Sequence, residues 1–424
     1  MISGRPLKVL IASENISMRM GGEASLGYYY LKLFAERGVE VWIVCHARVR
    51  DELAGSLPPA LFARTHFVED TRFQKTSWRI GHELLSDRVA ELLLGQVLLS
   101  STQRRARLMV RSLVARHEID VVFQPDPIAP KSLSFMYDVG APVVIGPMCG
   151  GLDFPPAFRG MDTTATRASV AVGRRLSKLA HRLVPGKVRA TGLIVANDCT
   201  RRALPSGCHG RIYEVPESGV DLRLWKPVSR TDSAGSSGRP VRFVFSGRFV
   251  GLKGASYLVE AFAEVVRNRS SILELIGDGE QRPEIEARVR SLGLSEHVRF
   301  HGWLKREAAA AIVRECDVFV MPSLRECGGT AILEAMAQGL PVIVANWAGP
   351  GQYVNDSCGI RVDVSSRESY VSGLSNAMDR LASSAELRQR LGRGGLQRVH
   401  ENCYDWGSKA DRVLAILREC CVAR

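Results

Sequence analysis

The sequence has no long apolar run, and this absence bears on where the protein works. The longest apolar-rich stretch, Leu92 to Leu99, is far shorter than the roughly 20 residues of a membrane-spanning helix. The N-terminal stretch MISGRPLKVLIASEN contains only a short apolar run and no small-residue cleavage site, so it does not read as a signal peptide. We therefore expect a cytoplasmic protein.

Motifs typical of metal and dinucleotide sites are also missing. The ten cysteines are scattered, and only Cys420 and Cys421 are adjacent. The sequence has no Asp-x-Asp motif and no His, Cys and carboxylate residues at metal-ligand spacing. It also lacks the G-x-G-x-x-G fingerprint of dinucleotide-binding proteins. We therefore predict that the protein needs no metal ion or other cofactor.

Aromatic residues are scarce, at 7% of the chain, whereas an excess of basic residues gives a formal net charge of +13. Such a charge favours an acidic partner, which can be nucleotide phosphates, an anionic membrane or a nucleic acid. Single-stranded nucleic acid is usually bound by basic residues interleaved with aromatic ones, and no such pattern or nucleic-acid motif occurs here. We expect no nucleic-acid partner, and a basic nucleic-acid-binding protein without catalytic activity is the alternative from a different class.

The stretch from Ser323 to Pro350 predicts a β-α-β unit. It follows an apolar run from Cys316 to Met321, which is typical of a buried parallel strand. Thr330 to Gln338 has helical character, Gly339 suits the end of that helix, and Leu340 to Ala345 returns to a strand. The loop between the first strand and the helix is therefore the place to look for binding residues.

Two carboxylates flank a glycine pair in this unit. Glu326 lies in the loop, Glu334 lies within the helix, and Gly328-Gly329-Thr330 stands between them at the helix start. Unpaired amides at a helix N-terminus favour a phosphate, and glycine lets the phosphate approach the backbone. Because carboxylates accept hydrogen bonds from sugar hydroxyls, the pattern suits a nucleotide sugar. The alternative is that both glutamates are solvated surface charges.

A second glycine-rich loop carries two cations. Val241 to Phe245 reads as a strand, and the loop that follows, Ser246 to Gly254, holds Arg248 and Lys253 five residues apart. An arginine fork and a lysine point charge can straddle a diphosphate. The alternative is a pair of ordinary surface cations.

The N-terminal part opens with a similar pattern. Lys8 to Ala12 and Val39 to Cys45 read as strands on either side of a helix from about Glu23 to Arg37. This order is typical of a doubly wound sheet, which binds ligands at the carboxyl ends of its strands. Gly21 and Gly22 lie at that end, directly before the helix.

These motifs resemble those of the retaining GT-B glycosyltransferases of family 4, also called glycosyl transferases group 1. Glu326-x7-Glu334 resembles the family's hallmark, and Gly247 to Gly254 resembles its Gly-Arg-x4-Lys-Gly element. The resemblance implies an α/β chain with two Rossmann-like domains, each a doubly wound parallel sheet, that face a cleft. It implies a metal-independent transfer of a sugar, with retention, from a nucleotide-diphosphate sugar to a glycan or lipid-linked acceptor.

The resemblance also assigns roles to residues. Glu326 would contact the transferred sugar, and Arg248 and Lys253 would neutralise the leaving phosphate, which makes these three the implied catalytic residues. Glu334 would bind ribose. The implied donor-binding residues are Gly21, Gly22, Gly328, Gly329, Thr330 and Glu334.

Domain boundaries follow from composition and from the resemblance. We expect an N-terminal acceptor-side domain over 1–228 and a donor domain over 241–405. The polar, Ser/Gly-rich segment 229–240 between them is typical of a flexible linker. A last helix over 406–424 is expected to pack back toward the N-terminal domain.

One position departs from the family pattern. Many family 4 members have a histidine where this chain has Phe123, so the role of that histidine near the reacting sugar does not carry over. His46, at the end of the second predicted strand, is a speculative substitute.

Three readings stay open at this stage. A GT-B nucleotide-sugar epimerase is the alternative enzyme. Two basic stretches, from Arg104 to Arg116 and from Arg167 to Arg189, fit either a solvated outer face or peripheral contact with an anionic membrane. Trp303 could flank the nucleotide base, although we expect it in the core.

Overall fold

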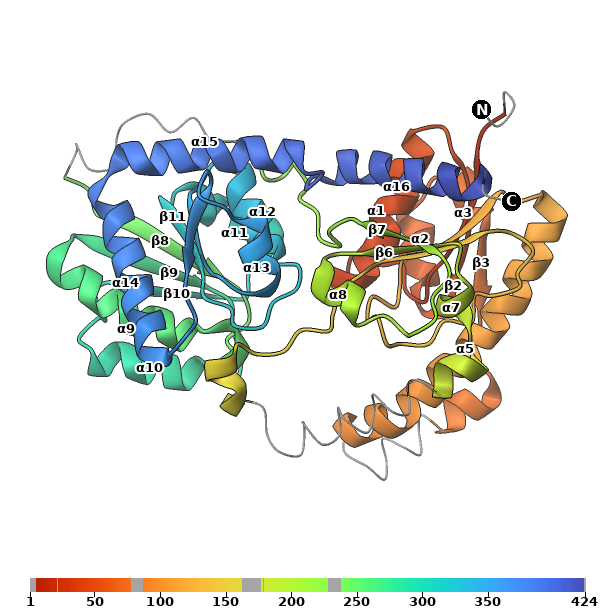
Figure 1. Ribbon diagram of the computed structural model, residues 1–424, viewed down its shortest axis with the longest axis horizontal. Helices are drawn as coiled ribbons and strands as arrows, with labels where there is room; N and C mark the ends of the chain where they lie inside the picture. Colours follow the sequence, from red (N-terminus) through yellow and green to blue (C-terminus); the bar gives the residue numbers. More distant parts are fainter. Residues whose placement is uncertain are drawn as a thin grey trace. The chain divides into compact units, whose positions relative to one another are not determined.

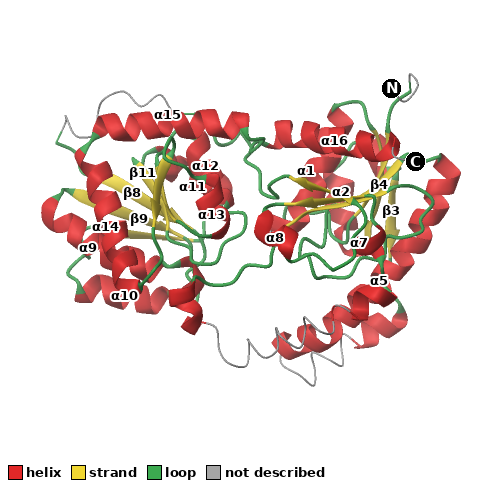
Figure 2. Ribbon diagram, viewed as in Figure 1, coloured by secondary structure: helices red, strands yellow, loops and turns green. Residues whose placement is uncertain are grey.

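The computed structural model describes residues 5–20, 22–77, 87–161, 177, 179–227 and 238–422. The chain divides into two compact units. Unit 1 comprises Met1–Gly151, Ser169–Glu217 and Lys409–Arg424, and unit 2 comprises Leu152–Ala168 and Ser218–Ser408 (Figure 1). Each unit contains a parallel sheet flanked by helices (Figure 2), so the predicted α/β fold with two parallel sheets is confirmed.

Unit 1 is built on a seven-stranded sheet with the order β3-β2-β1-β4-β5-β6-β7. All pairs of neighbouring strands are parallel. Most strands are continuous buried apolar runs, as expected for a parallel sheet that helices cover on both faces. The strands are β1 Lys8–Ala12, β2 Glu40–His46, β3 Thr65–Val68, β4 Val121–Gln124, β5 Val143–Met148, β6 Gly192–Val195 and β7 Arg211–Glu214. The helices are α1 Gly22–Glu36, η1 Ala47–Val49, α2 Arg50–Ser56, α3 Pro59–Phe62, α5 Asp87–His117, α7 Gly186–Arg189 and α8 Asp198–Arg202.

Unit 2 is built on a six-stranded parallel sheet with the order β10-β9-β8-β11-β12-β13. The strands are β8 Val241–Ser246, β9 Ser271–Ile276, β10 Val298–Gly302, β11 Val318–Met321, β12 Val342–Ala345 and β13 Gly359–Val362. The helices are η2 Pro156–Met161, η3 Gly251–Lys253, α9 Ala255–Asn268, α10 Arg282–Ser291, α11 Arg306–Arg314, α12 Thr330–Ala337, α13 Ala348–Tyr353, α14 Arg367–Ser383 and α15 Ala385–Glu401. The last helix, α16 Trp406–Val422, starts in unit 2 and belongs to unit 1 from Lys409 onward.

Sheet order places one pair of loops in each unit where ligands are expected. In a doubly wound sheet, the loops diverge at the point where the strand order reverses. In unit 2 this point lies between β8 and β11, and in unit 1 it lies between β1 and β4. In unit 2, the loops after β8 and β11 carry most of the predicted site residues.

Gly254, at the end of the loop after β8, packs closely against Pro322 at the start of the loop after β11. Its backbone is left-handed, with φ at +71°, and a Cβ atom there would lie 2.2 Å from the carbonyl oxygen of Pro322. Only glycine fits both the conformation and this close approach. The loop after β8 is thereby held against the end of β11.

Residues 152–161, which the sequence analysis placed in the N-terminal domain, group with unit 2. Phe154 and Phe158 are buried in the core of unit 2, and the Phe158 ring packs edge-on against Tyr257 and Tyr370. The Trp347 indole N–H donates to the carbonyl oxygen of Asp153 at 2.9 Å. Most of the predicted linker, residues 229–237, lies outside the described residues.

Within the described part of the chain, no helix combines the length and the apolar character that crossing a membrane requires.

Candidate functional site

Two predicted catalytic residues meet at the switch point of unit 2. Lys253 lies at the end of the loop after β8, and Glu326 lies in the loop after β11. The Lys253 Nζ atom forms an ion pair with Glu326 Oε2, and each side chain is 16% exposed. The sheet topology therefore brings together two residues that are 73 positions apart.

The glycine pair forms the start of α12. Gly329 is the N-cap residue with a left-handed backbone, φ 58° and ψ 48°, and no side chain caps the helix. Gly328 and Gly329 are buried, and Thr330 is the first helical residue. Because no side chain caps the start of α12, an anion can approach the Thr330 and Ala331 amides, and the helix dipole favours it there. The Ile332 amide already donates to the Gly329 carbonyl oxygen at 2.8 Å.

Glu334 lies further along α12 and is paired with a residue that the sequence analysis missed. Arg306 Nη2 donates to Glu334 Oε1 at 3.1 Å, and the Glu334 side chain is 14% exposed. Burial raises the pKa of Glu334, and the charge of Arg306 opposes this effect. Arg306 is 28 positions away at the start of α11, so no local motif pointed to it.

The other predicted residues are less constrained. Arg248 is exposed, two residues beyond β8, and no side chain pairs with it among the described residues. Gly22 is the first residue of α1 in unit 1. Gly21 lies outside the described residues.

The switch point of unit 1 holds a buried carboxyl group, Asp126, just after β4. It accepts hydrogen bonds from Ser13 Oγ at 2.5 Å and from the Glu14 amide at 3.1 Å. Burial raises the pKa of Asp126 to about 7, although both hydrogen bonds oppose the shift. This group therefore titrates near neutral pH.

Phe123 and His46 are both buried in unit 1. The Phe123 ring packs edge-on against Tyr30, with centroids 5.1 Å apart. His46 Nδ1 accepts from the Arg48 amide at 3.1 Å, so its Nε2 carries the proton and donates to Asp70 at 3.1 Å. Burial lowers the pKa of His46. Both ring nitrogens of the speculative substitute are therefore engaged within the unit.

Trp303 is not a core residue, and that expectation was wrong. Its side chain is 65% exposed. Gly302 ends β10 in a left-handed conformation with φ at 66°, which turns the chain out of the sheet before Trp303.

Three arginines of the first basic stretch contact unit 1 itself. The guanidinium of Arg107 lies 3.7 Å from the Tyr137 ring centroid, and that of Arg104 lies 5.3 Å from the Phe135 centroid. Arg105 donates to the carbonyl oxygen of Glu69. In the second basic stretch, residues 167–176 and 178 lie outside the described residues.

Comparison with known proteins finds similarity over part of the chain. Residues 231–398 match the family described as "Glycosyl transferases group 1". The lipopolysaccharide core biosynthesis glycosyltransferase LpsE of Rhizobium meliloti is 37% identical over 150 residues, which are 35% of this chain and 42% of that protein. A D-inositol 3-phosphate glycosyltransferase of Saccharomonospora viridis is 31% identical over 48% of this chain and 49% of that protein. The chain thus spans about half the length of the curated relatives that it matches.

Solved structures resemble nearly the whole chain. Sucrose-phosphate synthase from Thermosynechococcus elongatus matches with a TM-score of 0.65 and 18% identity, and the match covers 98% of this chain and 100% of that one. Anabaena Alr3699/HepE in complex with UDP matches with a TM-score of 0.64 and 16% identity, covering 97% of this chain and 100% of that one. At this identity the likeness establishes the fold, which is GT-B.

Proposed function

We propose that the chain transfers a sugar from a nucleotide-diphosphate sugar, with retention of configuration, to a hydroxyl of a glycan or lipid-linked acceptor. Residues 231–398 match the model of the group 1 glycosyl transferases, and the chain has the GT-B fold, which supports this proposal. The observation that carries this proposal is the Lys253–Glu326 ion pair beside the uncapped start of α12. LpsE, a relative named for lipopolysaccharide core biosynthesis, supports a glycan acceptor.

In this proposal, the Lys253–Glu326 ion pair forms in the absence of the donor, and donor binding separates the two side chains. The donor diphosphate binds Lys253 and the Thr330 and Ala331 amides of α12, and Arg248 adds a second cation. Glu326 is then released to accept hydrogen bonds from the transferred sugar. Charge that develops on the leaving diphosphate is stabilised by groups already in place, which is usually the largest single contribution to catalysis.

Glu334 binds the ribose hydroxyls in the same proposal. Its carboxylate is held by Arg306 at 3.1 Å, which fixes its orientation before the nucleotide arrives. The HepE structure holds UDP, so UDP is the first nucleotide to test.

We propose that no metal takes part, since Arg248 and Lys253 in the loop after β8 neutralise the diphosphate. Excess chelator should therefore leave the rate of transfer unchanged, and a loss that added magnesium restores would contradict this part. We also propose a cytoplasmic location and, for the basic helices, peripheral contact with anionic lipid.

The test of the proposed function is nucleotide binding by Glu334→Gln. A nucleoside diphosphate at a hundred times its dissociation constant adds about 2.7 kcal/mol of stability, and each kcal/mol raises the melting temperature by roughly 2–4 °C. UDP, GDP and ADP are compared by thermal unfolding. We expect one of them to stabilise the wild type and to bind Glu334→Gln at least tenfold more weakly, since the amide is a poorer acceptor for two hydroxyls.

Glu307→Gln is the matched control, because Glu307 is an exposed glutamate in the first turn of α11 in the same unit. It should keep the nucleotide shift of the wild type. No shift with any nucleotide would contradict the donor site. Product analysis without acceptor then separates the two enzyme classes: nucleoside diphosphate and free sugar support a transferase, and an epimerised nucleotide sugar supports the epimerase.

A further inference from the structure

Trp225 is a buried residue of unit 2 whose indole N–H forms no hydrogen bond of ordinary geometry with any described residue. The residue is 3% exposed and belongs to the hydrophobic core of the unit. An indole N–H can only donate, and a buried donor without an acceptor is rare in folded proteins. The group that this N–H faces is therefore of interest.

The Trp225 N–H faces the carboxylate of Glu334. Burial raises the pKa of Glu334, and both the Arg306 guanidinium and the Trp225 N–H oppose that shift. Arg306 Nη2 already donates to Glu334 Oε1 at 3.1 Å. Two donors therefore border the carboxylate, one of them charged and the other neutral.

The two donors differ in their contact with water. The Arg306 side chain is 40% exposed, so water and salt partly screen its charge. Trp225 lies in the core, where packing fixes the ring and water does not compete for its N–H. Trp225 is therefore the donor whose position depends least on the solvent.

The backbone around Trp225 is anchored within unit 2. Its amide donates to the Asp221 carbonyl oxygen at 2.9 Å. Just before this turn, the Val220 amide donates to the Tyr404 carbonyl oxygen at 2.9 Å, and the Val220 carbonyl oxygen accepts from the Trp406 amide at 3.1 Å. The segment that carries Trp225 is thus fixed to the same unit as α12.

The number of acceptor sites on a carboxylate explains why a second donor is useful. An ionised carboxylate accepts only, and its two oxygens offer about four sites. When Arg306 and Trp225 take one site each, about two sites remain. Ribose presents two neighbouring hydroxyl groups, so the remaining sites match it.

We propose that Trp225 is a positioning residue of the donor site: its indole N–H and Arg306 hold the Glu334 carboxylate and leave its other acceptor sites to the ribose hydroxyls. The hydrogen bond to Trp225 reaches ordinary geometry when the nucleotide binds. The inference rests on the proposed function, in which Glu334 binds ribose. Trp225 lies outside residues 231–398, which match the family.

A double-mutant cycle tests the contact without any ligand. Trp225→Phe keeps an aromatic ring in the core and removes the N–H, and Glu334→Gln removes the charge. The free energy of unfolding is measured at about pH 4, below the raised pKa of Glu334, and at about pH 9. Trp225→Phe should destabilise the chain more at the higher pH, because an N–H bonds a carboxylate more strongly than a neutral carboxyl group.

In the Glu334→Gln background, the effect of Trp225→Phe should be the same at both pH values. An effect that does not depend on pH in the wild-type background, or that is equal in both backgrounds, would overturn the proposal.

Tyr370→Phe is the matched control, because it also deletes a buried polar group of unit 2 that has no hydrogen-bond partner among the described residues. Tyr370 is fully buried against Phe158 and Tyr257. Burial raises the pKa of its hydroxyl further above the usual value, so it stays neutral over this range. Its effect on stability should be the same at both pH values.

Nucleotide binding is the second measurement, with UDP as the first probe and GDP and ADP after it. We expect Trp225→Phe to bind the nucleotide at least about fivefold more weakly, as for the loss of a hydrogen bond to a charged group. Tyr370→Phe should bind it like the wild type. In the Glu334→Gln background, Trp225→Phe should cause no further loss. Full binding by Trp225→Phe would refute the role of Trp225.

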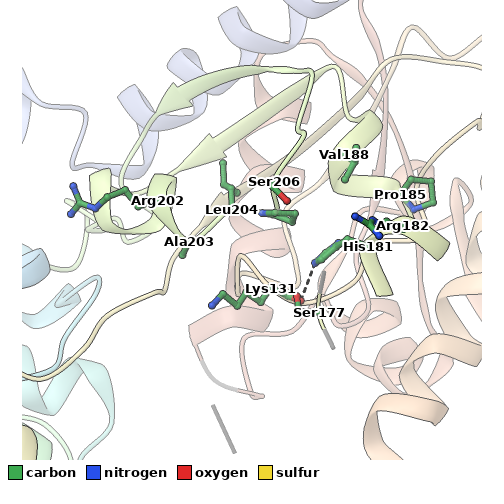
Figure 3. Close-up of a pocket in the computed structure, with 11 residues that line it drawn as sticks. Lys131, Ser177, His181, Arg182, Pro185, Val188, Arg202, Ala203, Leu204 and Ser206 are labelled. Atoms are coloured by element: carbon green, nitrogen blue, oxygen red, sulfur yellow. Dashed lines mark hydrogen bonds between the residues drawn. The ribbon is translucent and has the colours of Figure 1, made fainter. Parts of the chain in front are cut away.

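Failure of the proposed function gives a different result. Unit 1 contains a cavity of about 740 Å³, in whose lining Arg202 points away from Arg182 (Figure 3). A nucleotide that bound there would bind Glu334→Gln as it binds the wild type, whatever the cycle reports. If Glu334→Gln alone weakens binding and the cycle shows no coupling, the donor site stands and the role of Trp225 is wrong.

Discussion

Asp126 is a single residue whose ionisation opposes folding. Its pKa is raised by burial from 3.8 to about 7, so between about pH 4 and pH 7 the folded chain holds a proton that the unfolded chain has lost. Stability from this group is therefore full below pH 4 and falls as pH rises through the window, by roughly 1.4 kcal/mol per pH unit. Asp126→Asn keeps an oxygen to accept from Ser13 and removes the charge. We expect the variant to lose this pH dependence and to be more stable than the wild type above pH 7.

Denaturant unfolding across the pH range checks this expectation. Asp51→Asn is the control, because Asp51 is an exposed aspartate of α2 in the same unit and should change stability by no more than about 0.5 kcal/mol at any pH. A slope in Asp126→Asn equal to that of the wild type would show that Asp126 ionises in the folded state as it does in the unfolded chain.

For single residues, the sequence indicated which positions belong to the candidate site but not which residues they contact. Lys253 and Glu326 each stand in a loop whose glycines and flanking strands are local signals. Their ion pair depends on the adjacency of β8 and β11, which local patterns do not contain. The same holds for Arg306 beside Glu334. The raised pKa of Asp126 depends on burial by distant residues.

At the scale of an element, Gly254 constrains the backbone conformation of the loop after β8. Gly254→Ala would place a Cβ 2.2 Å from the Pro322 carbonyl oxygen in a left-handed conformation, so either the loop or the end of β11 must shift. We expect the variant to lose more than about 2 kcal/mol of stability in unit 2, because strain and a backbone clash add. Urea unfolding followed by circular dichroism measures the loss.

Gly55→Ala is the matched control within a helix. A Cβ at Gly55 of α2 meets no atom within 4 Å. Alanine in a helix is favoured over glycine by roughly 0.5–1 kcal/mol, so this variant should be slightly more stable than the wild type. If both substitutions had the same effect, the close approach of Gly254 to Pro322 would not constrain the loop.

Elements were predictable where a local pattern was strong. The predicted strand from Lys8 to Ala12 matches β1, and the helix expected from Thr330 to Gln338 is α12, Thr330–Ala337. The expected helix from Glu23 to Arg37 is α1, Gly22–Glu36. Helical periodicity and continuous apolar runs in the sequence predict the bounds of these elements. No local pattern predicted the turn that exposes Trp303. Tryptophan is an apolar residue, so its identity alone did not distinguish an exposed position from a core position.

On the scale of the molecule, composition predicted a linker over 229–240, most of which lies outside the described residues, but did not predict the exchange of segments between the units. Residues 152–161 join unit 2 because Phe154 and Phe158 pack in its core, and the chain from Lys409 onward joins unit 1. These assignments depend on contacts between residues far apart in sequence. Local composition does not record such contacts.

The proposed donor site lies in unit 2, and hydrogen exchange should therefore place nucleotide binding in that unit. A ligand that binds only the folded state at a hundred times its dissociation constant slows local opening by about a hundredfold. UDP should slow exchange of amides over 247–254 and 323–334 in unit 2 and leave 179–183 and 203–206 of unit 1 unchanged. Protection of 179–183 or 203–206 without protection of 247–254 and 323–334 would mean that the nucleotide binds outside the loops of unit 2, and the donor-site assignment would then be wrong.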